Sequence, residues 1–329
     1  MLIAMFGAVE LGVIYAIMAL GVYITFRVLD FPDLTVDGSF VTGAAVTTVS
    51  IMNGVPPFVA TIFGALAGFL AGCITGILHT KGKINPLLSG ILMMIALYSI
   101  NLRIMGQPTL SLLNESTVFT QLRSFWDKTG IDSFLNGLWT SFGLEKAPGT
   151  WSILLVMLAF TLVIKWVTDY YLKTEVGLAL RATGDNQRMI KSFSANTDTL
   201  IIIGVGISNG FVALSGGLIA QHGGFADVGM GIGLIIIGLA SVIIGEALFG
   251  TKTIRKTTFA VIGGAIIYRI VVTLALRVDF LDTGDMKLIT ALLVIAALVS
   301  PKIVQTRKEK KRRLQKRAEL AQQKSEGGQ

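Results

Sequence analysis

Long apolar stretches separated by short polar ones repeat from one end of the chain to the other. Nine of them stand out, and most contain the roughly 20 residues with which an α-helix crosses a bilayer. They cover approximately residues 4–26, 38–53, 57–78, 85–104, 151–169, 199–220, 232–249, 257–276 and 286–301. The pattern predicts an all-α polytopic membrane protein with about nine transmembrane helices. Continuous apolar runs disfavour a membrane β-barrel, whose strands show short alternating segments.

The composition supports this prediction. Of the 329 residues, 53% are hydrophobic and only 15% are charged, whereas soluble domains carry about 25% charged residues. The net charge of +8 comes almost wholly from residues 302–329, which hold ten Lys or Arg and three Glu. We expect residues 304–329 to form a disordered basic cytoplasmic tail that contacts membrane lipid, and we expect no nucleic-acid partner. The single cysteine, Cys73, excludes an intrachain disulfide.

Basic residues also favour one orientation of the chain in the membrane. With the N-terminus outside, the cytoplasmic loops and tail hold twenty Lys or Arg, and the outer loops hold four. Because cytoplasmic loops are enriched in basic residues, we predict an N-terminus outside and a cytoplasmic C-terminus. Residues 105–150 then form a long extracytoplasmic loop, and residues 170–198 form a long cytoplasmic one. The outer loop is rich in Phe and Trp, and Phe142 is one of these residues. This density of aromatic side chains predicts short interfacial helices or a docking surface.

The stretch LDFPDLTVDGSF at residues 29–40 places three carboxylates between two apolar segments. Pro32 disfavours a helix, and Asp and Thr side chains bond to the local backbone. We therefore predict a discontinuous helix near 29–40, with Asp33 or Thr35 as the N-cap of the next helix and Gly38 free to take an unusual φ. Two alternatives stay open from composition. The stretch is either a cytoplasmic turn with solvated acids or a helix break that dips into the membrane and lines a translocation path.

Other polar residues are scattered through the apolar segments. Intramembrane polar groups usually face the interior of the helix bundle. Asn209 is a candidate for the lining of a pore, and Arg269 is expected to neutralise a buried acid. Four glycines spaced four residues apart, Gly64, Gly68, Gly72 and Gly76, lie along one helical stripe. They predict close helix packing and no chemistry.

The predicted cytoplasmic loop contains YLKTEVGLALRATGDNQRMIKSFSANTDTL at residues 171–200. A short apolar patch is followed by Arg181, by the turn formers Gly184, Asp185 and Asn186, and then by a second polar helix. An amphipathic element between two spans suits a cytoplasmic partner or an interfacial helix that lies on lipid.

We expect no catalytic residues, no cofactor and no metal. GEALFGTKT at 245–253 is similar to the phosphate-binding loop G-x-x-x-x-G-K-[ST], but Thr251 occupies the position of the essential lysine. His222 has no second ligand at a metal-binding spacing. The energy for any transport must therefore come from an ion gradient or from another subunit.

Several stretches together resemble a known family. The resemblance is carried by LGVIYAIMALGVYITFRVLDFPDLTVDGSF (11–40), KGKINPLLSGILMMIALYSINLRIMG (81–106), EVGLALRATGDNQRMI (175–190), ISNGFVALSGGLIAQHGGFADVGMGIG (207–233) and VIIGEALFG (242–250). They are similar to the permeases of bacterial ABC importers, in the superfamily of branched-chain amino-acid and ribose permeases. Within it the chain is most similar to the tryptophan/tyrosine transport system permease group. The resemblance implies that residues 1–303 form the permease domain and that the chain lies in the bacterial inner membrane.

The resemblance also implies roles for individual residues. The stretch at 175–190 matches the loop that couples the permease to its ATPase, and its contact candidates are Gly177, Arg181, Gly184, Asp185 and Asn186. The stretch DLTVDG matches the start of a membrane helix near the transport route. The candidates for the translocation path are Asp33, Thr35, Asp37, Asn85, Asn101 and Asn209. The implied partners are two ABC ATPase subunits, a second permease copy in a homodimer and an extracytoplasmic substrate-binding protein.

The implied function is inward movement of a small solute by alternating access, powered by the separate ATPase. An amino acid, aromatic in the group that matches, is the implied cargo, although no local motif identifies it. The alternative is a stand-alone secondary transporter or channel that is coupled to an ion gradient.

Overall fold

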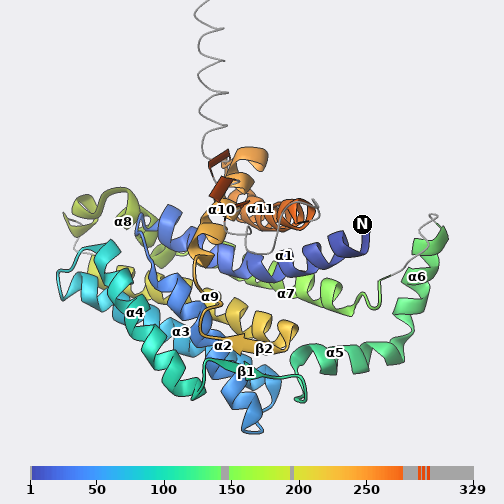
Figure 1. Cartoon of the computed structure of the whole chain (residues 1–329). Coiled ribbons are helices and arrows are strands. Elements are labelled where there is room, and N and C mark those ends of the chain that lie inside the picture. The colour runs from blue at the N-terminus through green and yellow to red at the C-terminus, as the bar shows by residue number, and fades with distance from the viewer. Residues whose placement is uncertain are drawn as a thin grey trace, which may run out of the picture.

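The computed structural model describes residues 2–141, 148–192 and 196–276, and short pieces at 288–289, 291–292 and 295–296. Its elements are almost all helices (Figure 1). They are α1 (Leu2–Tyr23), the π-helical turn η1 (Ile24–Val28), α2 (Thr35–Met52), α3 (Pro57–Thr80), α4 (Pro86–Met105), β1 (Thr109–Ser111), α5 (Val118–Trp126), the 3-10 turn η2 (Asp127–Thr129), α6 (Ile131–Ser141), α7 (Ser152–Tyr171), α8 (Glu175–Ser192), α9 (Thr197–Gly223), β2 (Phe225–Asp227), α10 (Leu234–Phe249) and α11 (Ile254–Ala275).

The prediction of an all-α polytopic membrane protein is confirmed. Eight of the nine predicted apolar segments coincide with helices, and the ninth, 286–301, lies mostly outside the described residues, as does the tail 304–329. Within the described part, six helices are long and apolar enough to cross a membrane: α1 continued by η1, α3, α4, α7, α9 and α11. The helices α2 and α10 are not among these six. The count of nine spans and the orientation in the membrane stay predictions.

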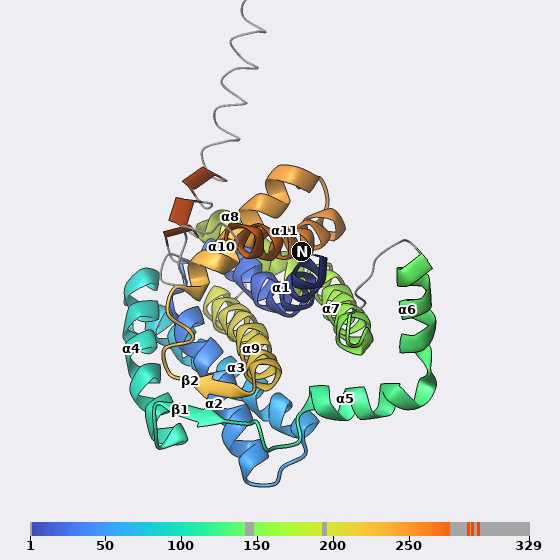
Figure 2. The ribbon, with the colours of Figure 1, turned by 45° about the vertical axis from the view of Figure 1, so that its right-hand side comes forward.

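The long helix α9 lies at the centre of the bundle. It packs against α1, α2 and α3, while α10 and α11 pack on each other and on α1 (Figure 2). Gly68 of α3 meets the side chain of Ala213 on α9, and Gly72 lies against the backbone of Val205 and the side chain of Asn209. The glycine stripe therefore does what the sequence predicts, because it brings the backbones of α3 and α9 together without intervening side chains.

A side chain at this contact is expected to destabilise the protein. In Gly68→Leu the new side chain would overlap Ala213, and overpacking of this kind costs about 1–3 kcal/mol or prevents assembly of the bundle. Gly7→Leu is the matched control, since no atom lies within 4 Å of the position that its Cβ would take. We expect a lower melting temperature in detergent for Gly68→Leu and an unchanged one for Gly7→Leu. Equal melting temperatures would contradict the packing role of Gly68.

The predicted outer loop forms an arm of two short helices, α5 and α6, that extends away from the bundle (Figures 1 and 2). The short helices are thus confirmed, whereas a position at the lipid interface stays a prediction. Phe119 is buried and Phe125 is exposed; Phe142 lies outside the described residues. The strand β1, which precedes the arm, pairs antiparallel with β2, so that Leu110 lies opposite Ala226.

Candidate functional site

The helical path breaks between η1 and α2, as the proline and the acids of this stretch predict. Residues 29–34 are not helical, and Asp30 has a left-handed φ of 51°. The Asp33 side chain is completely buried. Its Oδ1 accepts a hydrogen bond from the backbone N of Thr35 (2.9 Å), and its Oδ2 accepts one from Nδ2 of Asn209 (2.6 Å). A carboxylate can be buried at tolerable cost only with such donors.

The start of α2 differs in detail from the sequence prediction. Leu34 occupies the N-cap position and makes no side-chain capping bond. The Asp33 carboxylate serves the first turn instead, while the Thr35 hydroxyl shares a hydrogen bond of 2.8 Å with that of Thr75 on α3. The expectation of an unusual φ at Gly38 is wrong, because Gly38 lies inside the helix and is absent from the positive-φ residues. Its lack of a side chain instead lets α2 approach Leu97 and Met94 of α4.

The second carboxylate of the break, Asp37, holds the start of another helix. Its Oδ2 accepts a hydrogen bond from the backbone N of Gly233, and its Oδ1 accepts one from the N of Ile235, both at 2.8 Å. These N–H groups belong to the N-terminal end of α10, where unpaired donors and the helix dipole favour an anion. Asp33 and Asp37 therefore fix the first turns of two different helices.

The break lies at an intermediate depth in the bundle. Gly38 packs against Met94 and Leu97 in the middle of α4, and Asp33 bonds to Asn209 in the middle of α9. A helix start at this depth, formed by buried acids, matches the discontinuous-helix alternative and not a solvated turn. Broken helices at intermediate depth are typical of substrate sites in transporters.

The remaining path candidates divide into buried and exposed residues. Asn101 of α4 is completely buried and donates from Nδ2 to the carbonyl oxygen of Gly38 (3.2 Å). Asn85 is exposed and caps α4 by accepting a hydrogen bond from the N of Leu87 (3.0 Å). The structure therefore brings Asp33, Thr35 and Asn209 into one buried group, places Asp37 and Asn101 nearby on α2 and α4, and leaves Asn85 out.

The predicted coupling segment is α8, which is kinked at Asn186 (φ −156°, ψ 88°). This kink agrees with the predicted turn at residues 184–186, and Oδ1 of Asn186 accepts a hydrogen bond from the N of Met189 at the start of the second half (3.1 Å). Of the five contact candidates, Arg181, Asp185 and Asn186 are exposed. Gly177 and Gly184 instead face the protein, where they lie against backbone atoms of residues 171–172 and 28–29.

This inward packing connects α8 to the helix break. Gly184 touches the carbonyl oxygen of Val28 and the backbone of Leu29, with no side chain between them. Leu29 and Leu180 also both pack against Gly204 of α9. The chain that enters the break is therefore in direct contact with α8, which is a connection that sequence reasoning missed.

Arg181 borders a cavity of about 370 Å³ together with Arg27, Glu246 and Lys252. Arg27 at the end of η1 forms an ion pair with Glu246 near the end of α10. Three basic residues that the charge rule assigns to cytoplasmic loops thus meet at one end of the bundle.

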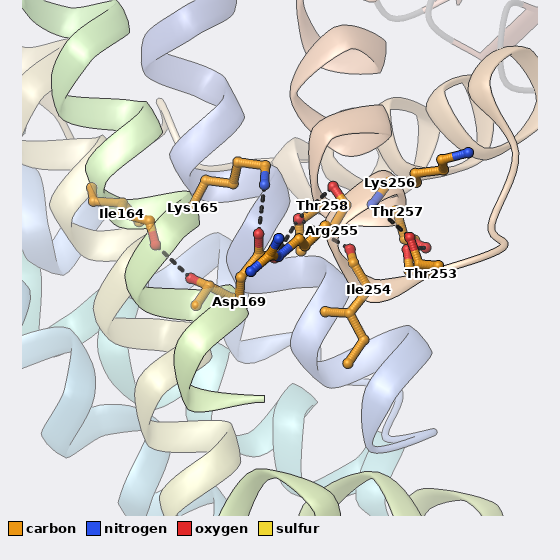
Figure 3. A network of polar contacts seen from close by, with 10 residues as sticks. Ile164, Lys165, Asp169, Thr253, Ile254, Arg255, Lys256, Thr257 and Thr258 are labelled. Atoms are coloured by element: carbon orange, nitrogen blue, oxygen red, sulfur yellow. Dashed lines mark hydrogen bonds and ion pairs between the residues drawn. The ribbon is translucent and has the colours of Figure 1, made fainter. Parts of the chain in front are cut away.

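A second polar network joins α7 to α11 near the same end (Figure 3). Asp169 is buried and accepts a hydrogen bond from Nζ of Lys165 (2.5 Å) and one from Oγ1 of Thr258 (2.6 Å). Figure 3 shows Lys165 and Asp169 on α7 turned toward Thr258 on α11. The i,i+4 spacing of Lys165 and Asp169 was visible in the sequence, whereas the contact with Thr258 joins residues 89 positions apart.

Over the described residues, Arg269 forms no ion pair with an acid, so its predicted neutralisation of a buried acid stays a prediction. Its guanidinium lies over the ring of Tyr15, with Cζ at 4.1 Å from the ring centroid. The ion pairs of the described residues are Arg27–Glu246 and Lys165–Asp169. An aromatic face attracts a cation in a poorly solvated site, and sequence alone could not distinguish this partner from a carboxylate.

The region similar to a phosphate-binding loop is helical over residues 245–249, at the end of α10. Over the residues that the structure describes, no three His, Cys, Asp or Glu side chains gather to hold a metal ion.

Comparison with known proteins adds independent information. Residues 4–298 match the family model described as the permease component of the branched-chain amino acid transport system. A tyrosine transport system permease protein of Clostridioides difficile (strain R20291) is 43% identical over 289 residues, which are 88% of each chain. The uncharacterized protein RP368 of Rickettsia prowazekii (strain Madrid E) is 34% identical over 207 residues, covering 63% of this chain and 64% of the other. No solved structure matches significantly.

Proposed function

The chain belongs to the family of branched-chain amino acid transport system permease components, and on this premise we propose that it is the membrane subunit of a binding-protein-dependent ABC importer. It is a multi-pass protein of the bacterial inner membrane. The proposed complex contains two copies of this chain, two ATPase subunits and an extracytoplasmic substrate-binding protein. The cargo is an amino acid, and the similarity to a tyrosine transport permease supports an aromatic one.

The contact between α8 and the helix break is the observation that carries this proposal. Exposed residues Arg181, Asp185 and Asn186 offer the ATPase a surface, and Gly184 on the same helix touches the backbone of Val28. Because packed interiors are poorly compressible, a displacement of α8 by the ATPase shifts the entry to the break. The chain then rearranges its path without carrying out any bond chemistry.

The mechanism is alternating access. Closure of the ATPase pair on ATP moves the two α8 segments, and the shift reaches the starts of α2 and α10 through Asp33 and Asp37. Both helices begin at an intermediate depth, so a change in their tilt opens or closes the path between the two permease copies.

Reconstitution of the chain with and without its ATPase and binding protein tests the proposal. Uptake of L-tyrosine into proteoliposomes is expected only with all partners and ATP present. A catalytically inactive ATPase is the matched control. Saturable uptake by this chain alone, driven by a proton or sodium gradient, would show instead that it is a stand-alone secondary transporter.

A further inference from the structure

A cavity of about 460 Å³ lies between α2, α4 and the turn that leads to α10. It combines one carboxylate, Asp37, with the amide of Asn101 and a wall formed by Met94, Ile95 and Tyr98. The described residues that line it include no Lys, Arg or His. The negative charge of Asp37 therefore has no opposite charge within the cavity. A volume of this size is in the usual range for small-molecule sites, about 300–1,000 Å³.

The Asp37 carboxylate can accept further hydrogen bonds. Each oxygen of Asp37 receives one N–H, from Gly233 or Ile235, and each retains a second lone pair. Asn101 uses its Nδ2 on Gly38, and its buried Oδ1 has no hydrogen-bond partner within the described part of the chain. Asn101 is completely buried and beyond the reach of a ligand, so Asp37 is the charged acceptor that the cavity offers to a ligand with N–H donors and a positive charge.

The surroundings of the cavity indicate that it faces water or a second chain. Ile95 and Tyr98 on its wall are 59% and 51% exposed, so the cavity opens on the outside of the single chain. A carboxylate that opens onto hydrocarbon is strongly disfavoured. This side of α4 is therefore suited to line a path between two copies.

We propose that this cavity is a transient binding site for the transported solute, with Asp37 binding an ammonium group and Tyr98 stacking on an aromatic side chain. The ligand class is a primary ammonium with an aromatic body. This inference rests on the proposed function and adds to it the site at which the path recognises the cargo. Offset or edge-to-face contacts between aromatic rings would stabilise the bound side chain.

A cysteine reporter tests the site without requiring transport. In full-length protein in lipid nanodiscs, Cys73→Ala removes the native thiol, and Ser99→Cys places a new one on the cavity wall, where Ser99 is exposed. Ser111→Cys on β1 is the control reporter outside the cavity. A trimethylammonium methanethiosulfonate should label Ser99→Cys at least about tenfold faster than the sulfonate analogue, because the cavity concentrates cations. Ser111→Cys should show a smaller preference.

Three small molecules test which chemical group of the ligand the cavity recognises. L-Tyrosine and tyramine carry the ammonium and should protect Ser99→Cys from labelling, whereas 3-(4-hydroxyphenyl)propionate lacks it and should not. Asp37→Asn should raise the half-protecting tyramine concentration at least about tenfold, as expected for the loss of a hydrogen bond to a charged group. Tyr98→Leu, at an exposed position that tolerates change, should raise it severalfold, and Tyr98→Phe should leave it unchanged.

Protection by the propionate equal to that by tyramine, or the absence of protection by any probe, would overturn the assigned site. Unchanged protection in both Asp37→Asn and Tyr98→Leu would do the same. Uptake by the assembled transporter distinguishes a failure of the proposed cavity site from a failure of the proposed importer function. ATP-dependent L-tyrosine uptake that is unaffected by these variants removes the site and leaves the importer. Uptake by the chain alone on an ion gradient removes the importer, whatever the labelling result.

Discussion

Arg181→Glu is expected to abolish copurification of the ATPase while membrane insertion stays intact. Arg181 is exposed on α8 and borders the same cavity as Glu246. The substitution replaces a cation that is available to the partner with an anion and adds a second carboxylate beside Glu246. On the proposal that ATPase docking buries the Arg181 charge against an acid, removal of this buried pair costs about 2–5 kcal/mol, so the retained ATPase should fall by more than about tenfold. The measurement is the amount of ATPase retained by tagged permease after solubilisation.

Lys81→Glu provides the matched control, because Lys81 is exposed in the turn between α3 and α4 and lies outside α8. It should retain the ATPase at the wild-type level. Deletion of Gly184–Asn186 is a second variant, since it removes the kink at Asn186 and should also prevent copurification. Wild-type retention in both α8 variants would exclude α8 as the coupling segment.

Asp33→Leu is expected to reduce uptake by the assembled transporter at least about tenfold and to lower its melting temperature. The leucine removes the acceptor for the backbone N of Thr35 and for Nδ2 of Asn209, both of which lie in the buried group. The variant leaves the backbone N–H of Thr35 unpaired, and Nδ2 of Asn209 keeps only its bond to the carbonyl oxygen of Val205. Each buried N–H that loses its acceptor costs about 1–3 kcal/mol. The first turn of α2 then loses its defined start. Uptake of labelled L-tyrosine and a thermal melt in detergent measure the two effects.

Asp198→Leu serves as the comparison, because Asp198 lies in the first turn of α9 and outside the break. It removes a carboxylate near a helix N-terminus, which is worth about 0.3–1 kcal/mol, and should leave uptake nearly unchanged. If Asp33→Leu retained wild-type uptake in well-expressed protein, the helix break would have no part in transport.

The helix break could be predicted from local chemistry, whereas the hydrogen-bond partners of its acids could not. Pro32 and three closely spaced aspartates marked the interruption at residues 29–34 in the sequence itself. Asp33 bonds to Asn209, 176 positions away, and Asp37 bonds to Gly233 and Ile235 across similar separations. Contacts of this kind depend on how helices pack, which hydrophobic periodicity does not encode for helices that are apolar on all sides.

Gly184, in the predicted coupling segment, illustrates the same limit. Turn chemistry at residues 184–186 correctly indicated an irregular helix with its kink at Asn186. Gly184 was assigned to the turn, whereas its observed position is a backbone contact with Val28. A glycine serves equally well for a turn and for a close approach, so only the position of the neighbouring element distinguishes the two uses.

The pairing of β1 with β2 gives the helix break a second structural connection, in addition to its contact with α8. The carbonyl oxygen of Pro108, just before β1, accepts a hydrogen bond from the N of Val228 (3.0 Å), five residues before the backbone donor that holds Asp37. The arm is therefore connected through β1 and β2 to the start of α10, while α8 contacts the chain that leads to the start of α2. Movements of the arm and of α8 would therefore meet at Asp33 and Asp37, two acids four positions apart that hold the starts of α2 and α10.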